Sequence, residues 1–289
     1  MRRPIFFPPL PVNITRMAKA FWTITFVLAS SILWPIAARA ALIRVPEEHK
    51  SIQQAVEAAA PGDEILVGPG TYKENILIAR PVVLRSSAGA SKTVIEAADG
   101  ALPSIKVEKT SNVTIRGFSA TGSHIAGAYL TGSSNITLAE CTLTKNTSGI
   151  IMHGTTESSI RENISNSNAQ YGLYMEKSHK NTIERNTASL NQDKGFFISN
   201  SNNNTISANS VNLNSWDGIM LYASTGNTVK GNKTLRNTYG LVISESPGNE
   251  LSDNTTVPNL FLILPIALIY LGVVSYLLQK NLLKAIYKE

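Results

Sequence analysis

Four hexapeptides of one pattern recur in the second half of the chain, and their spacing constrains the fold more than any other feature. They read NTIERN, NTISAN, NTVKGN and NELSDN, and they start at Asn181, Asn204, Asn227 and Asn249, at steps of 23, 23 and 22 residues. A fixed period of this length is typical of repeat proteins, in which each unit packs only against its neighbours. The chain is therefore expected to fold as a solenoid.

The composition of the repeats decides between helical units and units built from strands. They are rich in Asn, Ser, Thr and Gly, which are poor helix formers, and they lack the apolar stripes of a helical repeat. Short alternating runs such as IIMH and LYME follow a glycine in each unit, and their first and third residues are expected to point inward. We predict an all-β, single-stranded right-handed parallel β-helix over residues 41–257, with coils of 22–23 residues.

Columns of asparagine and glycine mark the corners of this coil. Stacked amides can hydrogen-bond to each other, so one column is interpreted as an internal ladder, beginning late because Phe118 and Cys141 hold the aligned earlier positions. Its members are Asn163, Asn186, Asn209, Asn232 and Asn254. The glycines are expected at corners that need a positive φ, and they are Gly127, Gly149, Gly172, Gly195, Gly218 and Gly240.

The net charge of +6 belongs to the two ends of the chain. Residues 1–40 carry +5 and residues 258–289 carry +2, which leaves −1 for residues 41–257, so no nucleic-acid partner is expected. Residues 1–40, with Met17 as an alternative start, have the basic, apolar and small-x-small segments of a secretory signal peptide. An uncleaved anchor is the alternative interpretation of this segment.

The other end predicts attachment to a membrane. Residues 258–279 are almost continuously apolar and long enough for a transmembrane helix, and a lysine-bearing tail of residues 280–289 follows, expected in the cytoplasm. The competing interpretation is a buried helix that caps the solenoid. The first interpretation predicts an exported protein at the periplasmic or other extracytoplasmic face, anchored in the cytoplasmic membrane.

The first folded segment reads SIQQAVEAAAPGDEILVGPGTYKENILI. Ser51 and Gln54 form a capping-box pattern before a short amphipathic helix that ends at Pro61-Gly62, and this helix is expected to cap the solenoid. Together with the NTI coils, this opening resembles pectin lyase-like right-handed β-helix proteins, and within them the NosD family. That resemblance implies an exported accessory protein that works with an ABC transporter in the maturation of copper-containing nitrous oxide reductase.

The sequence shows no arrangement that supplies a general acid and a general base. Asp193 and Asp217 precede glycines of the column, but the neighbouring coils carry no acids at these positions. Met152 and His153 are copper-type side chains, yet as strand neighbours they are expected to point to opposite faces. No catalytic residue and no cofactor is therefore expected, with a bound copper ion as the alternative.

One outward column should be polar on a soluble solenoid but is apolar: Tyr129, Ile151, Tyr174, Phe197, Met220 and Val242. A contiguous exposed apolar stripe typically marks an interaction surface, although strands favour Tyr, Phe and Ile on any face. The candidate partner-binding residues, which include part of the adjacent outward column, are Tyr129, Ile151, His153, Tyr174, Glu176, Phe197, Met220 and Tyr222. The leading hypothesis is a non-enzymatic NosD-like accessory protein that docks on a membrane complex such as an ABC transporter. The alternatives are a surface protein that binds or cleaves polysaccharide, and a purely structural envelope protein.

Overall fold

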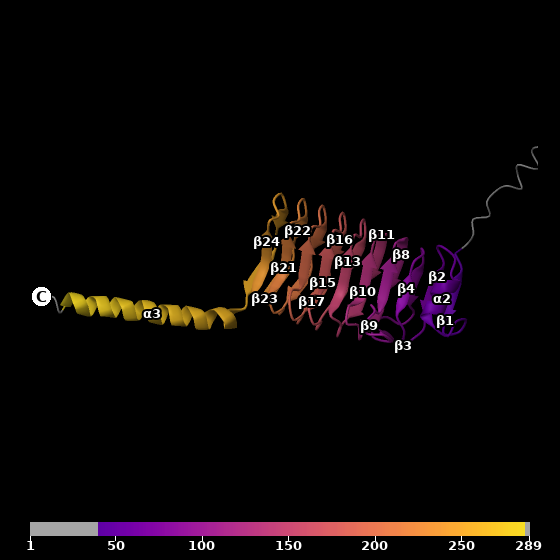
Figure 1. Ribbon diagram of the computed structural model, residues 1–289, viewed down its shortest axis with the longest axis horizontal. Helices are drawn as coiled ribbons and strands as arrows, with labels where there is room; N and C mark the ends of the chain where they lie inside the picture. The colour runs from indigo at the N-terminus through magenta and orange to yellow at the C-terminus, as the bar shows by residue number, and fades with distance from the viewer. Residues whose placement is uncertain (1–39, 287–289) are drawn as a thin grey trace, which may run out of the picture. The chain divides into compact units, whose positions relative to one another are not determined.

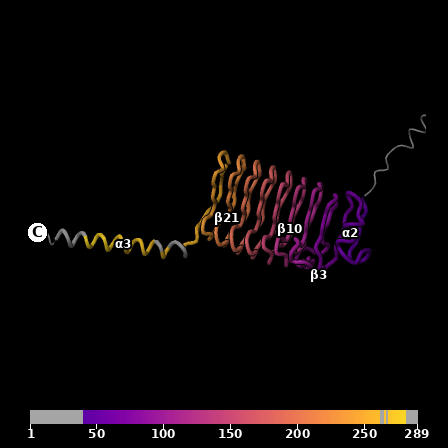
Figure 2. The backbone as a smooth tube through the Cα atoms, in the orientation of Figure 1, coloured from indigo at the N-terminus to yellow at the C-terminus, as the bar shows by residue number. Residues whose placement is uncertain are grey.

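A computed structural model describes residues 40–286 of the chain. The predicted signal peptide lies outside the described residues, apart from Ala40. Residues 42–258 form a parallel β-helix of about nine turns, in which strands that are far apart in sequence stack in order along the solenoid (Figures 1 and 2). The prediction of an all-β solenoid is confirmed.

Three sides of the coil are formed by parallel sheets. The ten-stranded sheet contains β1 (Leu42–Val45), β2 (Glu64–Val67), β5 (Val83–Ser86), β8 (Ser111–Arg116), β11 (Ser134–Ala139), β14 (Ser159–Arg161), β16 (Thr182–Glu184), β19 (Thr205–Ser207), β22 (Thr228–Lys230) and β25 (Glu250–Ser252). The eight-stranded sheet contains β4 (Ile76–Ile78), β7 (Ile105–Glu108), β10 (Ala126–Thr131), β13 (Ser148–His153), β15 (Leu173–Glu176), β18 (Phe196–Ser199), β21 (Asp217–Tyr222) and β24 (Tyr239–Ser244). The third side consists of two four-stranded sheets, with β3 (Gly70–Lys73), β6 (Thr93–Glu96), β9 (Ser119–Thr121) and β12 (Thr142–Leu143) in the first, and β17 (Thr187–Ser189), β20 (Ser210–Asn212), β23 (Lys233–Asn237) and β26 (Thr255–Pro258) in the second.

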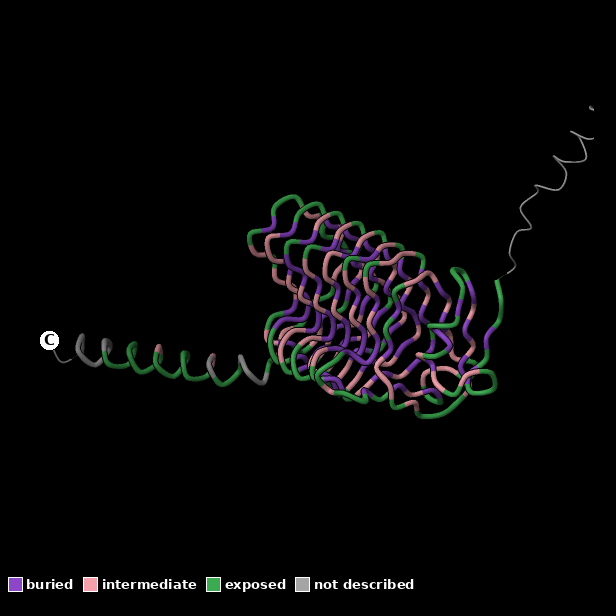
Figure 3. Tube along the Cα trace, turned by 45° about the vertical axis from the view of Figure 1, so that its right-hand side comes forward, coloured by how far each residue is buried: buried purple, intermediate pink, exposed green. Residues whose placement is uncertain are grey.

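The core is a continuous column of apolar side chains inside the coils. Figure 3 shows buried residues recurring among partly exposed and exposed ones along successive turns, because each strand turns alternate side chains inward. In β13, Ile150 and Met152 are buried, while Ile151 and His153 are partly exposed. Cys141 is also buried in this core.

Asparagine side chains connect the coils at their corners. The Oδ1 atom of Asn186 accepts hydrogen bonds from both the backbone N–H and the side-chain amide of Asn163, each at 3.0 Å. The side-chain amide of Asn186 in turn donates to the Ile160 carbonyl and to Asn209 Oδ1. Two further columns repeat this pattern, namely Asn181, Asn204, Asn227 and Asn249, and Asn146, Asn168, Asn191, Asn214 and Asn237. Within residues 40–286, no buried side-chain nitrogen or oxygen lacks a hydrogen-bond partner.

The prediction that the glycine column needs a positive φ is wrong. None of its six glycines has a positive φ. A Cβ atom on Gly195 would instead lie 2.0 Å from Val211 Cγ1 and 2.7 Å from the Gly218 carbonyl oxygen. Glycine is required at these six positions because an added Cβ atom would lie within 3.0 Å of a side chain on the third side of the coil.

The N-terminal end of the core is covered by α2 (Ile52–Ala58), which buries Ile52, Ala55 and Val56. Ser51 Oγ accepts the Gln54 N–H, and the Glu74 carboxylate accepts the backbone N–H groups of Ile52 and Gln53. These acceptors satisfy the otherwise unpaired donors of the first helical turn. The predicted capping helix is thus present at the predicted place.

At the other end, α3 (Leu260–Ile286) follows β26 and contains Pro265. Within the part of the chain that the structure describes, no helical stretch is both long and apolar enough to cross a bilayer. The prediction of a transmembrane helix over residues 258–279 therefore receives no support from the structure.

Candidate functional site

The candidate site lies on the outer face of the eight-stranded sheet. Strand register places Tyr129, Ile151, Tyr174, Phe197, Met220 and Val242 directly beside one another on successive coils. All six side chains are partly exposed, and we call them the apolar column. Toward the N-terminus, the register continues this column through Lys106 to the exposed Leu77.

Three aromatic rings gather in the middle of this face. The ring centroids of Tyr171, Tyr174 and Phe197 lie 5.4–5.7 Å from one another, with Tyr174 and Phe197 stacked at 20°. These distances are in the range of favourable aromatic pairs. We call these three residues the aromatic cluster, and it forms a partly exposed platform across two coils.

A lysine and two aspartates lie at the edge of this platform. Lys194 Nζ is 2.9 Å from Asp193 Oδ1, 3.7 Å from Asp217 Oδ2 and 5.7 Å from the centroid of the Phe197 ring. The Asp217 side chain is only 9% exposed, whereas that of Asp193 is 29% exposed. We call these three residues the acid–lysine cluster, in which one ammonium is shared by two carboxylates.

Burial and nearby carboxylates raise the pKa values of the two tyrosines in the aromatic cluster. Burial and the neighbouring Glu176 carboxylate, which also accepts a hydrogen bond from the phenol, raise the pKa of Tyr174 to about 12. Burial and the charge of Asp193 raise the pKa of Tyr171. Burial lowers the pKa of Lys194, but the hydrogen bond and charge of Asp193 outweigh it, so that this pKa is raised overall. The two phenols are therefore hydrogen-bond donors and not bases at neutral pH.

The second outward column supplies polar groups beside the aromatic rings. His153, Glu176, Ser199 and Tyr222 lie in register on consecutive coils, and His153 Nδ1 is 3.3 Å from Glu176 Oε2. The structure thus brings all eight candidate partner-binding residues onto one face.

Sequence reasoning missed Tyr171 and Lys194, and it set Asp217 aside as a site residue. Each directly precedes a glycine of the column, and the backbone N–H groups that follow pair these positions coil by coil. The signal was present in the sequence, because the same position holds the small residues Ala126 and Ser148 in the earlier coils. Asp193 and Asp217 were weighed as a pair of acids, but the lysine between them was not.

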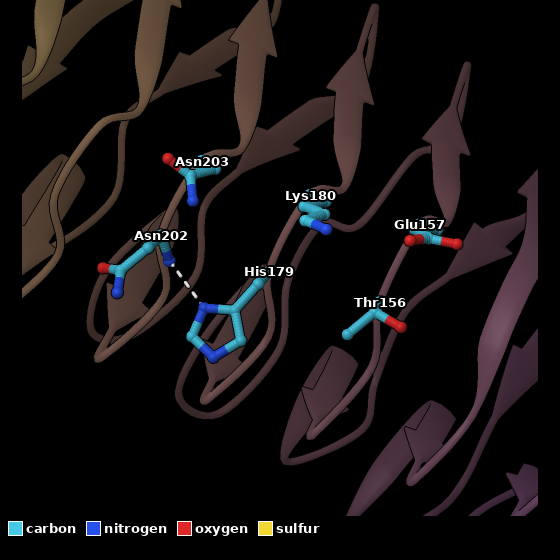
Figure 4. A pocket seen from close by; sticks show the side chains of 6 residues that line it. All are labelled: Thr156, Glu157, His179, Lys180, Asn202 and Asn203. Carbon is cyan, nitrogen blue, oxygen red and sulfur yellow. Dashed lines mark hydrogen bonds between the residues drawn. The ribbon is translucent and has the colours of Figure 1, made fainter.

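A shallow pocket of about 450 Å³ lies elsewhere, on the turns between the eight-stranded and ten-stranded sheets. Figure 4 shows its six lining residues, Thr156, Glu157, His179, Lys180, Asn202 and Asn203, on three successive turns. His179 Nδ1 accepts the backbone N–H of Asn202 at 2.9 Å, so this histidine is used to join two coils. The pocket is a groove along equivalent turns of successive coils, so it is a weaker candidate for a binding site than the aromatic face.

Metal-binding and nucleophilic side chains do not converge in the folded part. Among residues 40–286, no three His, Cys, Asp or Glu side chains are grouped so that they could hold a metal ion. Met152 is fully buried, while the His153 side chain is 43% exposed on the opposite side of the strand. Burial raises the pKa of the Cys141 thiol to about 11, so this cysteine is neither a ready nucleophile nor a metal ligand at neutral pH.

The acid–lysine cluster is not arranged for hydrolysis of a glycosidic bond. Hydrolysis of a glycosidic bond requires two carboxylates on opposite sides of the bond, whereas Asp193 and Asp217 bind the same ammonium and Asp217 is nearly inaccessible. Proton abstraction requires an accessible base. The two tyrosines of the platform have raised pKa values, whereas His153 and Glu176, 3.3 Å apart, are partly exposed side chains of that chemical type on this face. What the face offers is aromatic surface with carboxylates and phenols at its edges.

Comparison with known proteins agrees with this fold. A family model described as "Right handed beta helix region" matches residues 103–256. No curated protein matches the chain. Among solved structures, the A-module of mannuronan C-5 epimerase AlgE4 from Azotobacter vinelandii is similar, with 18% identity, a TM-score of 0.57, and coverage of 70% of this chain and 71% of that one.

Two further structures are similar at the same level. Pectate lyase Pel9A shares 14% identity with a TM-score of 0.57, over 75% of this chain and 79% of that one. The D317A mutant of the periplasmic alginate epimerase AlgG shares 13% identity with a TM-score of 0.53, over 74% of this chain and 55% of that one. At these identities the likeness shows the fold alone. No comparison points to the NosD family in particular.

Proposed function

The chain belongs to the right-handed beta helix family, and from that premise we propose that it binds a polysaccharide on the outer face of its eight-stranded sheet. The observation that carries the proposal is the aromatic cluster with its polar border. Sugar rings pack their C–H faces against aromatic side chains and use their hydroxyls as donors to carboxylates. Tyr171, Tyr174 and Phe197 supply the first element, and Glu176 and Asp193 supply the second.

The spacing of the coils also fits a polymer. Equivalent residues on adjacent coils are separated by about 4.8 Å, which is close to the length of one sugar in an extended chain. A polysaccharide that runs along the solenoid would therefore meet a similar set of side chains at every step. The apolar column, from Tyr129 to Val242, offers six such steps.

The similar structures support a polysaccharide ligand more than they support an accessory role. Their names describe a mannuronan epimerase, an alginate epimerase and a pectate lyase, all of which act on polysaccharides. We carry over from them only the class of ligand. The acid–lysine cluster is not arranged for hydrolysis, so the proposal is limited to binding.

The proposal is tested with the full-length chain and a panel of soluble polysaccharides. A double variant, Tyr174→Thr with Phe197→Thr, should weaken binding at least about fivefold, because each lost aromatic stack contributes about 0.5–1.5 kcal/mol. The matched control is Thr182→Ala with Thr205→Ala on the ten-stranded sheet, which should bind within about twofold of the wild type. Equal binding by the wild type and the aromatic variant would refute the proposal.

Export and membrane attachment are separate predictions and are not needed for this function. Membrane attachment through residues 258–279 and a signal peptide over residues 1–40 can be checked by fractionating cells that make the full-length chain. The NosD-like hypothesis would regain support if mild crosslinking recovered transporter subunits that the aromatic double variant failed to recover.

A further inference from the structure

We infer that the polysaccharide taken by this face is uncharged, and that the face discriminates against polyuronates. This inference rests on the proposed function and names its ligand class. It starts from the charges on the outer face of the eight-stranded sheet. It runs against the ligands named for the similar structures, mannuronan, alginate and pectate, each of which is a polyanion.

Carboxylates outnumber ammonium groups on this face. Its outward columns and the acid–lysine cluster carry Glu108, Glu176, Asp193 and Asp217 against Lys106 and Lys194. The turns at the ends of its strands add Lys109, Lys177 and Glu245, which still leaves one carboxylate in excess. A polymer that brings one carboxylate per sugar would therefore meet net repulsion.

Both lysines within the face are already neutralised by partners. Lys106 Nζ lies 2.8 Å from Glu108 Oε1, and Lys194 Nζ lies between Asp193 and Asp217. The Lys194 side chain is only 19% exposed. A uronate would have to displace a carboxylate from the ammonium in order to bind it, and would leave that carboxylate near its own charge.

A divalent cation could in principle bridge a uronate to the acidic side chains. Within residues 40–286, no group of three or more His, Cys, Asp or Glu side chains is placed to hold a metal ion, so these residues offer no preformed site for such a bridge. The rings of the aromatic cluster, by contrast, need no charge on the ligand. The Glu176 carboxylate, next to Tyr174, is best matched to hydroxyl donors, which every uncharged hexose or pentose chain provides.

The test measures equilibrium binding of the full-length chain to xyloglucan and galactomannan, which are uncharged, and to alginate and polygalacturonate, which are polyuronates. We expect an uncharged polymer to bind at least about tenfold more tightly than either polyuronate at low salt, with a smaller gap at 0.5 M salt because charge repulsion is screened. Glu176→Gln should strengthen polyuronate binding severalfold. Glu184→Gln, which removes the same charge from the ten-stranded sheet, should not change it.

The outcomes separate this inference from the proposed function. Polyuronate binding as tight as that of the uncharged polymers, if it is lost in the Tyr174→Thr, Phe197→Thr variant, would overturn the inference and leave the proposed function standing. Binding of no polymer of either class would overturn both. A thermal melt of each variant identifies any loss of binding that is caused by unfolding.

Discussion

The two large sheets of the solenoid have the same parallel stacking but different outer surfaces. On the ten-stranded sheet, the outward column in register reads Thr114, Thr137, Ser159, Thr182, Thr205 and Thr228. On the eight-stranded sheet, the corresponding outward column is the apolar column of Tyr, Ile, Phe, Met and Val residues. Both columns lie on short parallel strands of the same coils.

The threonine column shows that strand preference alone does not explain the apolar column. Tyr, Phe and Ile could stand on an outer face merely because strands favour them. Threonine satisfies the same strand preference while remaining polar, and the chain uses it on the ten-stranded sheet. Arginine and glutamate pairs at the edge of that sheet, such as Arg116–Glu140 and Arg185–Glu162, complete an ordinary solvated surface. The apolar column is therefore not required by the fold, which favours a role in binding.

If the buried interior stabilises the fold, the residues on both outer faces can differ without loss of folding. Gly195→Ala is the change that should damage this interior most. The new Cβ atom would lie 2.0 Å from Val211 Cγ1 and 2.7 Å from the backbone oxygen of Gly218, and a backbone cannot move aside cheaply. We expect a loss of about 3–5 kcal/mol in the free energy of unfolding, measured by urea denaturation.

Gly231→Ala is the control that separates close atomic approach from backbone strain as the cause of this loss. Gly231 has a φ of +64° and no atom within 4 Å of an added Cβ, so Gly231→Ala suffers only the strain of its backbone conformation. That substitution should cost about 1 kcal/mol. If the two variants lost equal stability, close approach would not be the reason for the glycine column.

Asn209→Ala should have the next largest effect. Asn209 Oδ1 accepts the backbone N–H and the side-chain amide of Asn186, and its own amide donates to the Ile183 carbonyl and to Asn232. Alanine leaves these buried groups without partners, and we expect a loss of about 2–3 kcal/mol in urea denaturation. A loss below about 0.5 kcal/mol would show that the ladder does not stabilise the coils.

The periodicity of the sequence predicted the parts of this molecule that repeat. The solenoid, the inward and outward positions of each strand and the apolar column all follow from residue spacing, because stacking imposes one register on every coil. The helical cap follows from its own capping-box pattern. The reason for the glycine column did not follow. It depends on the distance between two sheets, and the side chains that fill that distance, such as Val211, lie about 16 residues further along the chain.

The acid–lysine cluster was missed for a different reason. Its members come from two coils and three sequence positions, and only the stacking places Asp217 beside Lys194. Searching one column at a time finds ladders of like residues. It does not find a column whose members differ in type, as Tyr171, Lys194 and Asp217 do before successive glycines.

The aromatic face itself should tolerate conversion to the threonine pattern. Tyr174→Thr with Phe197→Thr removes the stacked pair and its contacts with Tyr171, so we expect a loss of about 1–2 kcal/mol in urea denaturation. The variant should keep the circular dichroism spectrum of the wild type. Unfolding of this variant would mean that the apolar column is needed for the fold, and the contrast between the two sheets would lose its functional meaning.

Asp217 is nearly buried although it lies at the edge of an outer face. Its substitution should produce the smallest change in the free energy of unfolding. Burial raises its pKa above the ordinary 3.8, with a further contribution from the charge of Asp193, although Lys194 opposes both. The folded chain therefore holds this proton more tightly than the unfolded chain does. The resulting stabilisation is present below pH 3.8 and is lost as the pH rises through the raised pKa.

Asp217→Asn stays uncharged across this range, so its stability relative to the wild type should increase between pH 3 and pH 7. The expected gain at pH 7 is under about 1 kcal/mol, because Lys194 loses one of its two partners but keeps Asp193 at 2.9 Å. Thermal melts at both pH values measure it. Asp253→Asn, which removes one carboxylate from an exposed turn, is the control and should show no such trend. A variant that is less stable than the wild type at pH 7 would mean that the charge of Asp217 is needed to hold Lys194 beside the aromatic cluster.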